Sequence, residues 1–212
     1  YQALAAGDPV KVSDTEYTVK LRDDAKFSDG TEVKADDVVE SFTRSSAKGS
    51  VYVPMLAPIA SVEKKDDKTV TVKTNIANFS LLKERLSIVR VVPASSTQDD
   101  MKKQPVGSGP WAYESISDNT LDLVPNKNYN GATPAKDDKL HYDVLKDPTA
   151  RLTAQQDGTT LAMEMVPADS VDQLKGAGCT VDDVQGFGVR FAMFNLGKAP
   201  WDNVKVRQAC LY

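Results

Sequence analysis

A change of hydrophobic period between residues 17 and 42 is the feature that most constrains how this chain folds. In "EYTVKLR" three apolar residues alternate with polar ones, which is the period of a strand with one buried face: Tyr17, Val19 and Leu21. After a turn signal, "SDG" at 28–30, four apolar residues recur at helical spacing: Ala35, Val38, Val39 and Phe42. The first part of the chain must therefore build a strand and then a helix.

The same stretch carries four carboxylates close together, Asp29, Asp36, Asp37 and Glu40, which raises the question of a metal site. A calcium loop needs the pattern D-x-[DN]-x-[DN]-G with Glu at its twelfth position, and no register of "DDAKFSDGTEVK" supplies it. Asp36 and Asp37 instead fall in the first helical turn, where the helix dipole stabilises a carboxylate by ~0.3 to 1 kcal/mol. We expect no metal there.

The rest of the chain has pairs of short strands first and strand–helix units later. Strand–turn–strand patterns occupy 61–74 and 111–126, with Val70 and Val72 on the inward face of the first. Further strands are predicted at 139–145, 159–165 and 187–196, each followed by a helix, at 147–158, 167–178 and 200–212. Asp202 is the predicted cap of the last helix. The fold class is therefore α/β.

The composition excludes several classes of protein. The 212 residues are 41% hydrophobic and 26% charged, which suits one or two globular domains. The net charge of -4 comes without a basic stripe, so no nucleic-acid partner is indicated, and no apolar run approaches the ~20 residues of a membrane helix. The opening "YQALAAGDPV" lacks the basic and apolar regions of a signal peptide. Cys179 and Cys210 fit neither a metal cluster nor a disulfide framework, and whether they pair stays open.

Residues that catalysis would use are sparse. The only histidine, His141, lies on a predicted strand, where it alternates outward with Lys139 and Asp143, so we expect it to face solvent. "GSGP" at 107–110 lacks the Lys-Ser/Thr of a phosphate loop and the third Gly of a dinucleotide fingerprint, which favours a tight crossover between subdomains. We therefore predict that the protein is not an enzyme and uses neither a cofactor nor a metal of its own.

Four stretches carry motifs that occur together in one known family. "YTVKLRDDAKFSDGTEVKADDVVESF" matches a strand ending in Leu-Arg, an aromatic-Ser-Asp-Gly-Thr turn and an Ala-x-Asp-Val helix. "VGSGPWAYES" matches Val-Gly-Thr-Gly-Pro-Tyr, with Ser108 for Thr and Trp111 for Tyr, and "LVPNKNYNG" matches Asn-Pro-x-Tyr-Trp, with Lys127 for Pro and Asn130 for Trp. "FNLGKAPWDNVKVRQACLY" matches Phe-Asn followed by a Pro-Phe-Asp-x-x-x-Val-Arg-Gln-Ala helix. In this order they resemble the extracellular solute-binding proteins of family 5, the peptide and nickel class that serves ABC importers.

The resemblance implies a periplasmic-binding-protein-like fold of class II, peptide-binding type, with two lobes joined by a hinge. This chain would cover most of the first, mixed-sheet lobe and be truncated before the second, with 1–106 as an outer subdomain and 107–212 as a hinge-proximal α/β subdomain. "FSDGTEVKADDV" would be a scaffold turn and helix start, with Asp29 bonding its own loop and Asp36 or Asp37 capping the helix.

The function implied by the resemblance is the substrate-binding component of an ABC importer, which captures an oligopeptide or dipeptide between its lobes and delivers it to a permease in the membrane. The protein would be extracytoplasmic, in the periplasm or on the cell surface as a lipoprotein, and the fragment monomeric. A nickel chelate, an opine or an oligosaccharide stays open as the ligand, and so does a chaperone-like module. A hydrolase is disfavoured because no Ser-His-Asp or paired-carboxylate arrangement can be placed in one cleft.

Four residues are the expected ligand contacts: Tyr52, Arg90, Phe187 and Arg190. Family members place an aromatic near the ligand after a helix and polar loop, as at Tyr52, and line the cleft at the start of the strand that leads to the hinge. Arg90 would meet a ligand carboxylate. The structural alternatives are core packing for the aromatics and solvated surface for the arginines. "GTTLAMEM" lacks the acidic pair of the family's Gly-Glu-x-Asp, so no role of that Asp is carried over.

Overall fold

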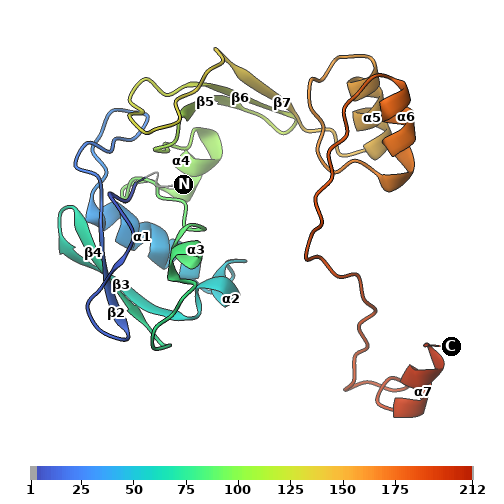
Figure 1. The fold of residues 1–212 in the computed structure, drawn as a ribbon, viewed down its shortest axis with the longest axis horizontal. Helices are drawn as coiled ribbons and strands as arrows, with labels where there is room; N and C mark the ends of the chain where they lie inside the picture. The colour runs from blue at the N-terminus through green and yellow to red at the C-terminus, as the bar shows by residue number, and fades with distance from the viewer. Residues whose placement is uncertain (1–3, 212) are drawn as a thin grey trace. The chain divides into compact units, whose positions relative to one another are not determined.

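The chain divides into two compact units, Tyr1–Leu145 and Lys146–Tyr212, which we call unit 1 and unit 2. A computed structural model describes residues 4–211 (Figure 1). Unit 1 contains two antiparallel sheets and four helices in its described part, and unit 2 contains short helices. The α/β class expected from the sequence is confirmed.

The first sheet of unit 1 has four strands in the order β1-β2-β4-β3. They are β1 (Val10–Lys11), β2 (Glu16–Lys20), β3 (Ile59–Asp66) and β4 (Thr69–Thr74). The helix α1 (Ala35–Ser46) packs against β3 and β4, and the short helices α2 (Val53–Leu56) and α3 (Leu82–Leu86) lie against each other. The strand–turn–helix order predicted from residues 17–42 is therefore present.

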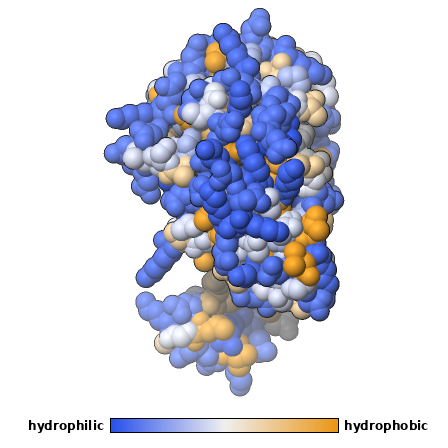
Figure 2. All heavy atoms as spheres, turned by 90° about the vertical axis from the view of Figure 1, so that its left-hand side faces the viewer, coloured by the Kyte–Doolittle hydropathy of each residue, from blue (hydrophilic) through white to orange (hydrophobic). Residues whose placement is uncertain are grey.

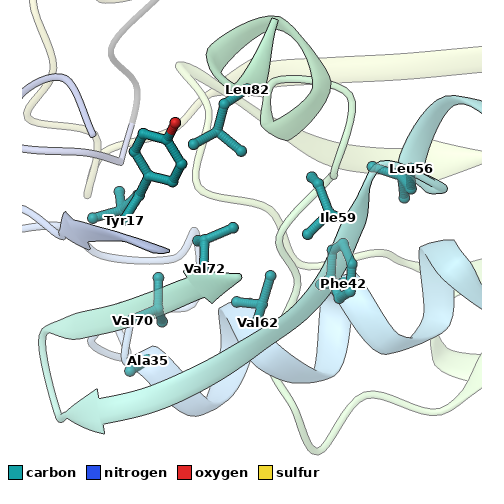
Figure 3. Close-up of a cluster of buried hydrophobic side chains, with 10 residues drawn as sticks. Tyr17, Ala35, Phe42, Leu56, Ile59, Val62, Val70, Val72 and Leu82 are labelled. Atoms are coloured by element: carbon teal, nitrogen blue, oxygen red, sulfur yellow. The ribbon is translucent and has the colours of Figure 1, made fainter. Parts of the chain in front are cut away.

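Ten buried side chains from these strands and helices form the main core of unit 1 (Figure 3). They are Tyr17, Val19, Ala35, Phe42, Leu56, Ile59, Val62, Val70, Val72 and Leu82. Fully burying a Val, Leu, Ile or Phe side chain contributes about 1.5 to 3 kcal/mol, so this cluster is the main source of stability in the first sheet. Val70 and Val72 point inward as predicted. A second, smaller cluster consists of Leu21, Ala25, Phe27 and Val33.

The second sheet of unit 1 has the order β5-β6-β7. Its strands are β5 (Trp111–Ile116), β6 (Thr120–Pro125) and β7 (Leu140–Asp143). The helix α4 (Gln98–Lys103) lies against β5 and begins with a capping box in which the Thr97 hydroxyl accepts the Asp100 amide. The first sheet ends before residue 106 and the second begins after it, so the subdomain boundary predicted at 106/107 falls between them and stays a prediction.

Unit 2 contains α5 (Pro148–Gln156), a 3-10 turn η1 (Ala168–Ser170), α6 (Val171–Gly176) and α7 (Val204–Ala209). The strands predicted at 159–165 and 187–196 are wrong, because both segments lack regular structure. An alternating pattern becomes a strand only where another strand offers hydrogen-bond partners, and the described part of unit 2 contains no strand. Asp202 does not cap α7; the side-chain oxygen Oδ1 of Asn203 accepts the Lys205 amide at 2.9 Å instead.

Candidate functional site

The clustered carboxylates at the start of α1 are structural. Asp29 Oδ1 accepts the Thr31 amide at 2.9 Å and the Thr31 hydroxyl at 2.7 Å, which confirms that Asp29 bonds its own loop. Asp37 Oδ2 accepts the Lys34 amide at 2.7 Å and so caps α1. Asp36 pairs with Lys64 at 2.7 Å instead. Across residues 4–211, no three His, Cys, Asp or Glu side chains are grouped in a way that could hold a metal ion.

Three of the sequence motifs meet at one junction in unit 1. The Ser28 amide of the "FSDG" turn donates to the Gly107 carbonyl of "VGSGP" at 2.8 Å. Asn128 of "PNKNYN" donates through Nδ2 to the Ser28 carbonyl at 3.0 Å, and the buried Asn126 donates to the Gly109 carbonyl at 2.8 Å. The Gly107 and Gly109 carbonyls of "GSGP" thus accept hydrogen bonds in the segment that connects the two sheets. One of these bonds comes from the "FSDG" turn.

Asn130 holds the position of Trp in the family motif that "LVPNKNYNG" resembles, and it adds polar contacts beside this junction. Arg22 donates to the Asn130 side-chain oxygen at 2.7 Å and to its carbonyl at 3.1 Å. Asn130 Nδ2 in turn donates to the Asp24 carbonyl. Hydrogen bonds of Asn130 with Arg22 and Asp24 therefore stand where the motif has an aromatic side chain.

The four predicted ligand contacts fall two in each unit. Tyr52 is partly exposed directly before α2, and Arg90 is exposed after α3, where its guanidinium donates to the Ser87 carbonyl at 3.2 Å. Tyr52 thus lies at the start of α2, whereas Arg90 follows the C-cap Ser87 of the neighbouring helix α3. Phe187 and Arg190 are exposed in the irregular segment of unit 2. Their roles stay predictions.

Unit 1 and unit 2 each carry a hollow that none of the four residues lines. The hollow in unit 1 has a volume of about 500 Å³ and is lined by Ala5, Ala6, Arg22, Asp23, Asp24 and Ala132. The hollow in unit 2, of about 400 Å³, is mostly apolar and is lined by Phe191, Ala192, Met193, Phe194, Leu196, Val204, Arg207, Gln208 and Leu211. The face of the molecule in Figure 2 is mostly hydrophilic, with small separate apolar areas.

His141 has more partners than its predicted outward position suggested. It is half exposed, as expected, but Nδ1 lies 2.6 Å from Asp122 Oδ1 and Nε2 lies 3.3 Å from Asp143 Oδ1. Hydrogen bonds from His141 and then from Ser115 lower the pKa of Asp122 to about 2. The spacing of His141 and Asp143 on one strand face was visible in the sequence, whereas the pairing of His141 with Asp122 depends on the register of β6 and β7.

This group is not a nucleophile triad. Ser115 Oγ donates to Asp122 Oδ2 at 2.8 Å, so the hydroxyl is bonded to the acid and has no histidine as its base. Cys179 and Cys210 are both free thiols. None of the described helices is long and apolar enough to cross a membrane.

Comparison with known proteins identifies the family. The model for bacterial extracellular solute-binding proteins, family 5 (middle), matches residues 1–212. A putative ABC transporter peptide-binding protein of Brucella ovis is 30% identical over 99% of this chain, and heme-binding protein A of Haemophilus influenzae is 31% identical over 99% of it. The chain spans 42% and 44% of those two relatives, less than half of each.

The fold agrees with this similarity. The crystal structure of NikZ from Campylobacter jejuni in complex with Ni(L-His) superposes with a TM-score of 0.76 at 21% identity, covering 99% of this chain and 44% of that one. The periplasmic-binding-protein fold expected from the sequence motifs is therefore confirmed, in a chain that corresponds to part of such a protein. Because the family model matches the chain from end to end, the chain belongs to the bacterial extracellular solute-binding proteins of family 5.

Proposed function

We propose that this chain is part of an ABC importer's solute-binding protein, which captures an oligopeptide or dipeptide between two lobes and passes it to a membrane permease. The observation that carries the proposal is the family match over the whole chain, together with a 30% identical relative named as a peptide-binding protein. The protein works outside the cytoplasm, in the periplasm or attached to the cell surface, and catalyses no reaction.

The exposure of the four expected ligand residues suits a protein that closes two lobes around its ligand. The chain spans less than half of those two relatives, and Tyr52, Arg90, Phe187 and Arg190 are all exposed. In such a protein a ligand that contacts both lobes favours the closed state, because only that state offers both sets of contacts. One lobe alone then binds weakly, since it supplies only part of the contacts.

A peptide ligand would be held through its main chain. Main-chain hydrogen bonds fix an extended peptide irrespective of its sequence, and water in the side-chain pockets tolerates varied residues. In this proposal Arg90 pairs with the peptide carboxylate and Tyr52 packs beside the chain. Heme is the second candidate ligand, because a relative of equal similarity is named for heme binding.

The test is a thermal-shift and calorimetric screen of the protein expressed from its whole gene, with the 212-residue chain alongside. Short peptides, hemin, a nickel–histidine complex and an oligosaccharide are the ligands. We expect a peptide to raise the melting temperature of the whole protein and to leave the single chain unshifted. Tight peptide binding by the chain alone would contradict the two-lobe mechanism, and a response to hemin only would make heme the ligand.

Matched variants test the ligand residues. Tyr52→Ala and Arg90→Ala should weaken peptide binding at least tenfold, while Lys103→Ala, an exposed change elsewhere in unit 1, should not. Phe187→Ala and Arg190→Ala are compared with Val184→Ala, which is exposed in the same irregular segment. Equal affinities across all variants would remove these four residues from the site.

A further inference from the structure

One face of the second sheet carries a row of polar side chains across all three strands. Asp122 on β6 is paired in register with Ser115 on β5 and with His141 on β7. Ser115 donates to one carboxylate oxygen of Asp122 at 2.8 Å, and His141 Nδ1 contacts the other at 2.6 Å. The row therefore links β7 to the rest of its sheet through side chains as well as through the backbone.

Both ring nitrogens of His141 face carboxylates. Nε2 lies 3.3 Å from Asp143 Oδ1, two residues along the same strand, while Nδ1 contacts Asp122. A neutral imidazole has one N–H, so it can donate to only one of these carboxylates and must turn a lone pair toward the other. The imidazolium has two N–H groups and satisfies both contacts, so this geometry selects the protonated ring.

Both positive and negative charges surround the His141 ring, and together they favour its protonated form. Lys139 lies 3.3 Å from Asp122 and 2.8 Å from Glu114, and its positive charge opposes that of the imidazolium. In the helix α4, which packs on β5, Asp99 pairs with Lys102 at 3.7 Å and Asp100 accepts hydrogen bonds from Thr97, while Lys103 adds a positive charge. The contact with Asp122, followed by that with Asp143, raises the pKa of His141.

β7 has little else to hold it. It is a four-residue edge strand, and Tyr142 on its opposite face is 50% exposed. A short edge strand with a poorly buried face has low local stability, so side-chain contacts across it weigh more than in a central strand. β7 is also the last strand before Lys146, where unit 2 begins.

We propose that His141 is a proton-operated clasp that fastens the edge strand β7 to β6 more tightly in acid than in alkali. Its proton is held more firmly in the folded chain than in the unfolded one. The stabilisation is therefore fully present below the ordinary histidine pKa of 6.5 and is lost as the pH rises through the raised pKa of the folded state. The clasp is independent of which solute the protein binds.

The test uses the fact that the chain has one histidine, so its ring proton resonances are unambiguous. We expect the NMR titration midpoint of His141 to lie above 6.5, to fall in Asp143→Asn, and to stay unchanged in Asp118→Asn, an exposed turn residue of the same hairpin region. A midpoint at or below 6.5, or one that Asp143→Asn leaves in place, would overturn the proposal.

Amide hydrogen exchange provides the second measurement. After correction for intrinsic rates, the β7 amides should exchange several-fold faster at pH 8.5 than at pH 5.5, and His141→Gln, which cannot titrate, should abolish that difference. Equal pH dependence in the two proteins would overturn the clasp. If His141→Gln does not fold, Asp143→Asn takes its place in the exchange experiment. Equal pH dependence of β7 exchange in Asp143→Asn and the parent chain would then overturn the proposal.

Discussion

Asp37 and Ala94 are joined across 57 residues by a hydrogen bond of 2.8 Å, in which the Ala94 amide donates to Asp37 Oδ1. The second oxygen of the same carboxylate accepts the Lys34 amide at 2.7 Å. One nearly buried side chain thus caps α1 and fixes the segment that follows α3. Within the carboxylate cluster at the start of α1, Asp37 therefore stabilises the fold through hydrogen bonds to two backbone amides.

Asp37→Ala should lower the free energy of unfolding by about 2 to 4 kcal/mol, because it removes a helix cap and leaves the Ala94 amide without its partner. Asp36→Ala is the matched control. It breaks only an exposed pair with Lys64, and exposed pairs contribute about 0 to 1 kcal/mol. Urea unfolding of both variants measures the difference, and equal costs would contradict the dual role of Asp37.

Gly30 should tolerate substitution less well than Gly109. Gly30 has a φ of +89° in the "FSDG" turn, a left-handed conformation in which a Cβ costs about 1 to 2 kcal/mol. Gly109 is outside the left-handed region and has no atom within 4 Å of an added Cβ. We expect Gly30→Ala to lower the melting temperature by several degrees and Gly109→Ala to leave it nearly unchanged. A larger loss of melting temperature in Gly109→Ala than in Gly30→Ala would show that the "FSDG" turn accommodates a Cβ at residue 30.

Asn126→Ala should destabilise the junction between the two sheets of unit 1. Asn126 is buried, and its side chain donates to the Gly109 carbonyl at 2.8 Å and accepts the Asn128 amide at 2.9 Å. Leaving such partners unpaired costs about 1 to 3 kcal/mol. Asn119→Ala, an exposed turn change, is the control. Calorimetry that shows no loss in Asn126→Ala would mean that water replaces the side chain.

Local patterns in the sequence predicted the elements whose apolar residues recur at the period of a strand or a helix. The alternation around Tyr17 and Val19 gave β2, and the spacing from Ala35 to Phe42 gave α1. The same alternation at 187–196 failed, because pairing depends on a strand elsewhere that the sequence pattern does not reveal.

Features that depend on register or exact geometry were also missed. Asp202 and Asn203 are adjacent and chemically equivalent as caps, and only the backbone decides that Asn203 reaches the Lys205 amide. The pairing of Asp122 with His141 is set by the β6–β7 register. The ligand roles of Tyr52, Arg90, Phe187 and Arg190 stay predictions.

Acid should weaken the second sheet through Asp122. Its pKa is lowered to about 2, so the stabilisation that its ionised form provides is present above the ordinary value of 3.8 and is lost as the pH falls toward 2. We expect Asp122→Asn to be less stable than the parent chain at pH 7 and to approach it near pH 2. Denaturant midpoints measured between pH 7 and pH 2 test this. A constant gap between the two proteins would assign the cost of the variant to altered packing.

Protease should cut the 212-residue chain first in the segment 180–194, which has no regular structure and exposes Phe187 and Phe191. Cleavage requires a locally unfolded chain, and an exposed irregular segment provides it without opening a core. Phe27 and Phe42, by contrast, are buried in unit 1 and should be cut late. Brief chymotrypsin digestion followed by mass spectrometry measures the order. Early cuts at Phe42 would contradict it. Protection of Phe187 that grows with protein concentration would instead mean that the alternating apolar residues of 187–196 pair with a second copy of the chain, as an exposed strand-forming sequence can.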